Sequence, residues 1–375
     1  MLKDKPIINL ISETNDILQD ALSKGITKVI PFEITSYLEQ NTFIFSGFKT
    51  YRELKEVSML LRGEDGGFKS FEKFKEDVIK IDNLYNKNYL NAEYNFAVQS
   101  SQMASKWLEF EESGEDYYLQ YRTAGDDKVR SEHQALAGIT LPVNDKFWSM
   151  YLPPNDWNCR CTVVQVLKDK YPLSSSEQAS AMGATATSKP KQKIFRFNPG
   201  KELKVFPPKH PYLPKGCNDC NVLKLSEGNR KEQCEWCRRL RNEALKKEDI
   251  KIKEYLGKNE IVFENSNFAT GKMKLTKESI NNYLSHARAL ETKVLITTFK
   301  ENQNLFQFKE RRELGEGKDL SNKKDRNNIS RKQKRGVLHY NVYYYKYKGK
   351  NWIIGFENIR NEFEQPYFIG IEKEK

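Results

Sequence analysis

The chain has 375 residues, 38% of them hydrophobic and 30% charged, and its formal net charge is +12. A chain of this length is typical of about two or three domains, each with its own core. No run approaches the roughly 20 apolar residues that a membrane span needs, and the first residues lack the apolar core of a signal peptide. We therefore expect a soluble protein that is made in a cytoplasm and has no membrane partner.

The positive charge is confined to one block of the chain. Residues 272–350 hold 20 Lys plus Arg and 8 Asp plus Glu, a surplus of 12, so the rest of the chain holds 43 residues of each sign. A basic excess in a single C-terminal block favours binding of a polyanion. The alternative is a solvated or disordered basic tract that only keeps the protein soluble.

The sequence predicts a helical region over residues 1–118. Apolar residues recur at steps of three and four within residues 7–22, and Gly25 ends that helix. Aromatic residues of the later helices are expected in the core, and nothing in this region indicates catalysis. The further helices are predicted to begin at residue 34 and to span residues 50–61, 68–85 and 91–112, with Phe71, Phe74 and Tyr85 as the aromatic core residues.

Residues 121–163 hold two groups of residues with unusual chemistry. In the first, Asp126 or Asp127 can accept a free amide hydrogen at a helix start, and Arg130 and His133 share a helix face because they are three residues apart. The second follows Pro153-Pro154, a pair that enforces an extended backbone.

Cys159 and Cys161 belong to this second group and alternate with Arg160 on a predicted strand, so both thiols face one side. Together with His133 they could form part of a metal site. The alternative is a buried thiol pair beside Trp157, with the histidine satisfied by a carbonyl group. The sequence shows no obvious fourth ligand, so it leaves both interpretations open.

This stretch resembles the phage Mu F-like head morphogenesis family, the minor head proteins of tailed phages. The resemblance implies a small α+β module over residues 119–212, which binds portal or capsid subunits in the bacterial host cytoplasm and ends up in the virion head. Small polar residues within it predict a linker over residues 173–190. The residues that carry the resemblance are Tyr121-Arg122-Thr123, Arg130, Glu132-His133, Gly138, Phe147-Trp148, Pro153-Pro154 and Asn158-Cys159-Arg160-Cys161.

Four further cysteines form two close pairs, Cys217 with Cys220 and, 13 residues later, Cys234 with Cys237. Each pair can hold a metal from a tight turn, and two pairs complete a tetrahedral thiolate site. We therefore predict one structural zinc in residues 213–258, a zinc knuckle followed by a charged helix over residues 238–256. The alternative is two reduced thiol pairs.

Residues 262–375 are predicted to form a separate domain with a helix first and an antiparallel sheet after it. Thr276 is expected to cap the helix, and a basic, turn-rich tract follows at residues 314–335. The strands are predicted at residues 305–308, 337–347, 352–358 and 363–371, with Gly349 in a turn.

The order of these elements resembles the barnase–EndoU–colicin–RelE-like nuclease superfamily of small metal-independent ribonucleases. The resemblance covers about 100 residues, which is the size of one small domain. The residues that carry it are Ser285-His286-Ala287-Arg288, Gly336 to Val342, and Gly349 to Trp352.

RNA cleavage without a metal needs a base, a cation and an acid. His286 and His339 are the histidines of this C-terminal part, and imidazole titrates near neutrality. Arg288 or Arg335 could hold the phosphate bidentately, as could Lys334, while Tyr340 or Trp352 could stack a base. The alternatives are a helix-terminal cation for His286 and a solvated strand residue for His339.

The sequence thus predicts a multi-domain α+β protein. We expect a phage or prophage minor head protein that carries a metal-independent ribonuclease-like toxin domain acting on RNA. The alternative is a purely structural head protein whose basic C-terminal domain binds nucleic acid or a partner without catalysis.

Overall fold

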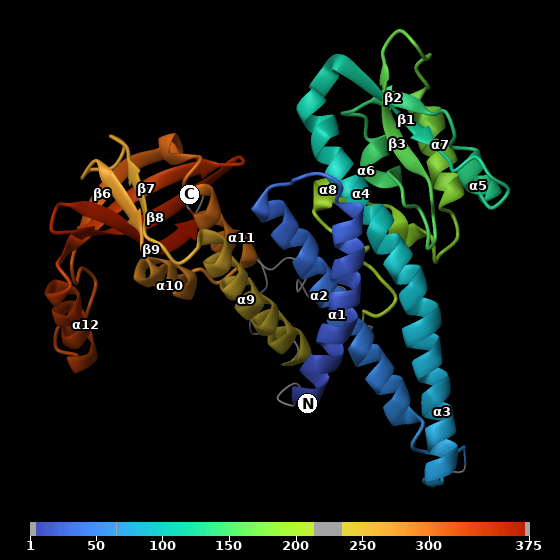
Figure 1. Cartoon of the computed structure of the whole chain (residues 1–375), viewed down its shortest axis with the longest axis horizontal. Coiled ribbons are helices and arrows are strands. Elements are labelled where there is room, and N and C mark those ends of the chain that lie inside the picture. Colours follow the sequence, from blue (N-terminus) through green and yellow to red (C-terminus); the bar gives the residue numbers. More distant parts are fainter. Residues whose placement is uncertain (1–4, 65, 214–234, 372–375) are drawn as a thin grey trace. The chain divides into compact units, whose positions relative to one another are not determined.

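The computed structural model describes residues 5–64, 66–213 and 235–371, shown in Figure 1. The described chain divides into two compact units, of which the first ends at Arg241 and the second begins at Asn242. Both mix helices and strands, which confirms the α+β fold class. Among the described helices, none combines the length and the apolar character that crossing a membrane requires.

The first unit begins with long helices, and α1 packs against both α2 and α4. Ile11, Leu18 and Leu22 on α1 are buried, as their spacing predicted, whereas Ile17 of the same pattern is 42% exposed. Two predictions are wrong. Helix α2 is one continuous helix where two were expected. Phe71, which was expected in the core, is 71% exposed, and α3 has no buried residue. The helices are α1 (Lys5–Gly25), α2 (Phe32–Met59), α3 (Phe71–Asn83), the π-helical η1 (Leu84–Tyr89), α4 (Leu90–Ser113) and η2 (Gly114–Asp116).

A small antiparallel sheet follows, with the strand order β2-β1-β3. Short helices pack around it over a core that includes Trp107 from α4, Tyr121 from β1 and Trp148 from α6. The elements are β1 (Tyr117–Arg122), α5 (Ser131–Gln134), β2 (Thr140–Pro142), α6 (Phe147–Tyr151), β3 (Thr162–Leu167), α7 (Ser176–Ala186), η3 (Lys193–Phe195) and α8 (Pro199–Glu202).

Helix α7 corrects the linker that was predicted over residues 173–190. Ser175 caps it by accepting a hydrogen bond from the Gln178 amide at 3.3 Å. The small residues Ala179, Gly183 and Ala186 are buried against the core. They are small because the helix lies close to its neighbours and not because the segment is a loop.

The second unit contains a six-stranded sheet in the order β4-β5-β9-β8-β7-β6, in which only β5 and β9 pair in parallel. Thr276 caps α10 as predicted, in a reciprocal pair with Ser279. The three strands predicted after residue 336 are confirmed, whereas the turn-rich tract contains the helix α12. The elements are α9 (Glu235–Leu256), which begins in the first unit and continues into the second, β4 (Ile261–Glu264), β5 (Lys272–Leu275), α10 (Lys277–His286), α11 (Leu290–Val294), η5 (Leu295–Thr298), η6 (Gln303–Leu305), β6 (Phe306–Glu313), α12 (Lys323–Lys334), β7 (Val337–Tyr347), β8 (Lys350–Ile359) and β9 (Phe363–Ile371).

Candidate functional site

His133 lies on the short helix α5, which begins after Arg130. The expected cap by Asp126 or Asp127 is wrong, because Arg130 occupies the N-cap position and makes no side-chain cap. Asp126 instead accepts a hydrogen bond from the Lys128 amide at 3.1 Å, in the turn before the helix. The His133 side chain points inward and is only 2% exposed.

Cys159 and Cys161 meet His133 from the segment that leads into β3. They precede this strand and do not lie on it, but both thiols face one side as predicted. The Nδ1 atom of His133 lies 3.6 Å from the Cys159 sulfur and 3.9 Å from the Cys161 sulfur. Asn158, just before Cys159, has a left-handed backbone conformation with φ of 57°, which asparagine tolerates. The chain turns here and brings the two cysteines toward His133.

Polar contacts fix the surroundings of the three side chains. Arg130 donates to the carbonyl of Trp157 at 2.9 Å, which connects the start of α5 to the cysteine segment. Arg160 points the other way and holds Asp126 through two hydrogen bonds of 2.6 and 2.7 Å. The buried Tyr121 hydroxyl donates to Asn155 at 2.8 Å. The cluster is therefore held by contacts outside itself.

The two cysteines differ in their acidity. The pKa of Cys159 falls well below its usual value, because Cys161 and then His133 hydrogen-bond to its sulfur, against the opposing effect of burial. The pKa of Cys161 rises, because its proton is held by Cys159 and its site is buried. Two cysteine sulfurs and an imidazole nitrogen are soft and borderline donors, a set that suits a transition metal.

A second candidate site is a cavity of about 500 Å³ in the second unit. The end of α10 contributes His286, whose ring lies 4.6 Å from the Tyr367 ring. Nδ1 of His286 donates to the carbonyl of Asn282 at 2.8 Å, which leaves Nε2 as an acceptor. Tyr340 from β7 and Lys332 from α12 also line the cavity.

Lys332 is one of three basic residues that line this cavity, with Arg312 and Lys318. Its ammonium donates to the Tyr340 hydroxyl and lies 3.7 Å from the centre of the Tyr367 ring. Glu357, which is fully buried, lies 3.6 Å from it. Burial lowers the pKa of Lys332, but hydrogen bonds to the two tyrosines outweigh this effect and raise it. Lys332 therefore stays charged.

The predicted catalytic residues are not all brought together. His286 lines the cavity, whereas His339 does not. His339 is 6% exposed, and burial lowers its pKa. Its neighbour on β7, Tyr340, lines the cavity, and successive strand residues point to opposite faces. Arg335 pairs with Glu357 at 3.1 Å and with Glu278 at 3.0 Å.

Arg288 is exposed and follows α10. Sequence reasoning missed Lys332 and Glu357, because a lysine on a basic helix and an acidic strand residue carry no signal of their own. The predicted zinc knuckle falls mainly on Cys217, Cys220 and Cys234, which lie outside the described residues. Cys237, its fourth member, is buried in α9.

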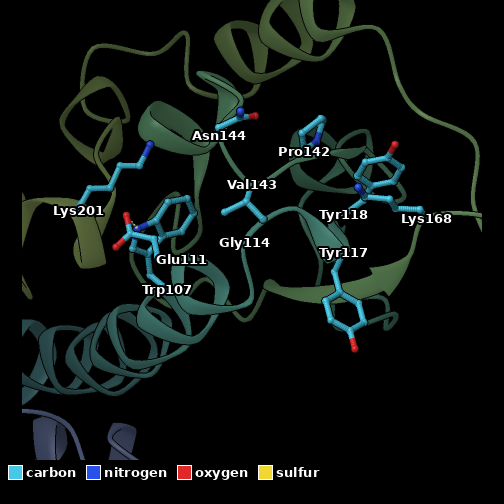
Figure 2. A pocket seen from close by; sticks show the side chains of 10 residues that line it. All are labelled: Trp107, Glu111, Gly114, Tyr117, Tyr118, Pro142, Val143, Asn144, Lys168 and Lys201. Carbon is cyan, nitrogen blue, oxygen red and sulfur yellow. Dashed lines mark hydrogen bonds between the residues drawn. The ribbon is translucent and has the colours of Figure 1, made fainter.

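Figure 2 shows a third hollow, of about 610 Å³, beside the small sheet of the first unit. Trp107 and Tyr118 contribute aromatic faces, and Lys201 and Lys168 lie 4.9 and 5.6 Å from the centres of these two rings. No histidine or cysteine lines this hollow among the described residues. Its charged lining residues are Glu111, Lys168 and Lys201.

Comparison with known proteins identifies the segment that contains the first site. Residues 61–164 match the family described as Phage Mu protein F like protein. His133, Cys159 and Cys161 all lie within this segment.

Two curated proteins resemble part of the chain. One is the protein F of Escherichia phage Mu that is named for capsid assembly, 34% identical over 71 residues, which is 19% of this chain and 16% of that protein. The other is the Mu-like prophage FluMu F protein of Haemophilus influenzae, 38% identical over 55 residues, which is 15% of this chain and 13% of that protein. The chain thus covers only a small part of either relative. No solved structure matches the chain significantly.

Proposed function

We propose that this chain is a phage or prophage minor head protein that contacts portal or capsid subunits during assembly. The observation that carries the proposal is the match of residues 61–164 to the Mu F family, supported by a relative named for capsid assembly. On this proposal the protein acts in the bacterial host cytoplasm during assembly and then resides in the virion head.

The test is genetic, in the phage or prophage that encodes the chain. Deleting the gene should abolish or malform heads in electron micrographs, and the wild-type gene should restore them. Trp148→Ala, which empties a buried position of the module core, should fail to restore heads. Normal heads without the gene, and absence of the protein from purified particles, would contradict the proposal.

A specific observation favours a second activity, cleavage of RNA by the second unit. The cavity brings His286, Lys332 and Tyr340 of the basic block together with Tyr367 of β9. In such a reaction a ribose 2′-hydroxyl attacks the adjacent phosphorus, and the 5′-oxygen leaves. The site needs an acceptor for the hydroxyl proton, a cation for the phosphorane and a donor for the leaving oxygen.

We assign these roles to residues that line the cavity. His286 accepts the proton through Nε2, and Lys332 stabilises the charge on the phosphorane. The Tyr340 hydroxyl, which already contacts Lys332, protonates the leaving oxygen. Arg335 holds Glu357 in place, and Arg288 contacts a flanking phosphate. His339 has no direct catalytic role in this assignment, because it lies outside the cavity.

The full chain should cleave RNA in the presence of EDTA, and His286→Ala and Lys332→Met should each lower the rate by about 100-fold or more, the usual contribution of a proton acceptor and of a charge-stabilising group. His339→Asn is the matched control and should retain activity. If the folded wild-type chain binds RNA in a salt-dependent way without cutting it, the alternative applies: a structural head protein with a basic, non-catalytic domain.

We also propose that Cys217, Cys220, Cys234 and Cys237 bind one structural zinc ion. The spacing of the two pairs supports this proposal. Zinc measured by mass spectrometry should fall by one ion per chain in the Cys217→Ser/Cys220→Ser variant. An unchanged zinc content in this folded variant would contradict the proposal.

A further inference from the structure

The cluster of His133, Cys159 and Cys161 has the dimensions of a metal site. Its three donor atoms lie within 4.8 Å of one another. Tetrahedral zinc, with Zn–N bonds of about 2.05 Å and Zn–S bonds of about 2.3 Å, separates a nitrogen from a sulfur ligand by about 3.6 Å. The observed separations from Nδ1 are 3.6 and 3.9 Å, close to this value for both sulfurs.

A hydrogen-bonded thiol pair fits these contacts less well. The single N–H of a neutral imidazole points at one acceptor, whereas Nδ1 of His133 lies at similar distances from both sulfurs. Nε2, the other ring nitrogen, is buried and has no hydrogen-bond partner among the described residues. No hydrogen bond to Nε2 therefore fixes the orientation of the His133 ring. The contact between Nδ1 and the two sulfurs accounts for it.

The balance of charge also favours a divalent ion. All three side chains are buried, with 2–3% of their surface exposed. An unpaired buried charge is costly, but two thiolates and one Zn²⁺ sum to zero. Sulfur and imidazole nitrogen are soft and borderline donors that select zinc or a similar metal over Ca²⁺ or Mg²⁺.

From these observations we propose that His133, Cys159 and Cys161 bind one Zn²⁺ ion, which fastens α5 to the segment that enters β3. Its protein ligands come from two parts of the chain that are 26–28 residues apart. Metal binding then stabilises the module directly, since the free energy of binding adds to that of folding. The ion is separate from the four-cysteine zinc proposed above.

The test uses the full chain with Cys217→Ser, Cys220→Ser, Cys234→Ser and Cys237→Ser, so that the other cysteine pairs do not contribute. One zinc per chain should remain in this background, and X-ray absorption should show two sulfur neighbours. Adding His133→Ala should weaken zinc binding by about 100-fold or more, beyond the usual effect of residues that only support ligands. His133→Cys, which supplies another soft ligand, should keep the ion.

Two results would overturn the proposal. One is a folded protein in this background that contains no zinc and whose melting temperature does not change when Zn²⁺ is added. The other is zinc content that survives Cys159→Ser/Cys161→Ser unchanged. If the cysteine variant does not fold, the response of the metal-free parent to Zn²⁺ decides: a rise in melting temperature supports the site, and no rise rejects it.

Discussion

His210 shows how a single buried side chain can make stability depend on pH. Its ring lies 4.9 Å from Phe45 and 5.8 Å from Phe48, and neither ring nitrogen has a hydrogen-bond partner among the described residues. Burial lowers its pKa from 6.5 to about 3. Between these two pH values the unfolded chain binds a proton that the folded chain does not bind, so stability falls as the pH falls.

We predict that His210→Phe removes this dependence. The wild-type first unit should lose about 1.4 kcal/mol per pH unit below pH 6.5 from this one group, and the variant should not. It should also be more stable at pH 7 by about 1 kcal/mol, because the two unpaired nitrogens are gone. Urea unfolding at several pH values measures both effects. His210→Gln, which cannot titrate, should flatten the slope without the gain at pH 7; equal slopes in all three proteins would refute the assignment.

Lys49 and Glu93 form a buried ion pair in the helical region. The two charges are 2.5 Å apart, with side chains 1% and 3% exposed. Lys49 also donates to the Tyr85 carbonyl at 2.8 Å, and Tyr212 donates to Glu93. This network connects α2, η1 and α4 to the segment after α8.

Lys49→Met should destabilise the first unit by about 3–5 kcal/mol, because it leaves a carboxylate buried without its partner. Glu93→Gln should cost a similar amount for the converse reason. The double variant should lose less than the sum of the two, since neither charge is then left alone. Chemical denaturation of the four proteins gives the coupling energy, and strict additivity would show that the pair acts independently.

At the scale of elements, α7 depends on the absence of a side chain. A Cβ atom at Gly183 would lie 2.6 Å from the Tyr151 ring. We predict that Gly183→Ala destabilises the first unit by about 1–3 kcal/mol through overpacking, although alanine is the better helix former. Met182→Ala on the exposed side is the matched control. Thermal denaturation tests the pair, and a stabilised Gly183→Ala would show that the ring moves aside.

Sequence patterns predicted elements well where local chemistry decides them. Thr276 caps α10, and the strands β7 to β9 follow their aromatic and β-branched residues. The same patterns failed for α7, because its small polar residues show no helical periodicity. This segment forms a helix because it packs against the core. They also placed Cys159 and Cys161 on a strand, although the two residues lie just before β3.

The candidate sites were predictable only in part, because they depend on contacts between distant segments. The approach of His133 to two cysteines was one of two open interpretations of the sequence. The cavity around Lys332 joins α10, α12, β7 and β9, and no local pattern predicts that meeting. His339 looked equivalent to His286 in the sequence, but His286 ends α10 and lines the cavity, whereas His339 lies on β7 and does not.

At the scale of the whole molecule, the two compact units have separate cores. We predict two calorimetric transitions, each sensitive to changes in its own unit. A Cβ atom at Gly355 on β8 would lie 1.9 Å from the Phe368 ring. Gly355→Val should therefore lower the melting temperature of one transition, while Trp148→Ala lowers the other. A single transition that both variants shift equally would show that the units unfold together.

Strand β6 forms one edge of the six-stranded sheet. An open edge offers unpaired backbone groups to any neighbouring sheet. Here that edge carries Lys309, and Arg311 and Arg312 form ion pairs with Glu313 and Glu310. The pairing with β7 is also irregular between Phe308 and Glu310. A second copy approaching edge-on would meet an uneven, charged rim, which opposes the joining of two copies into one continuous sheet.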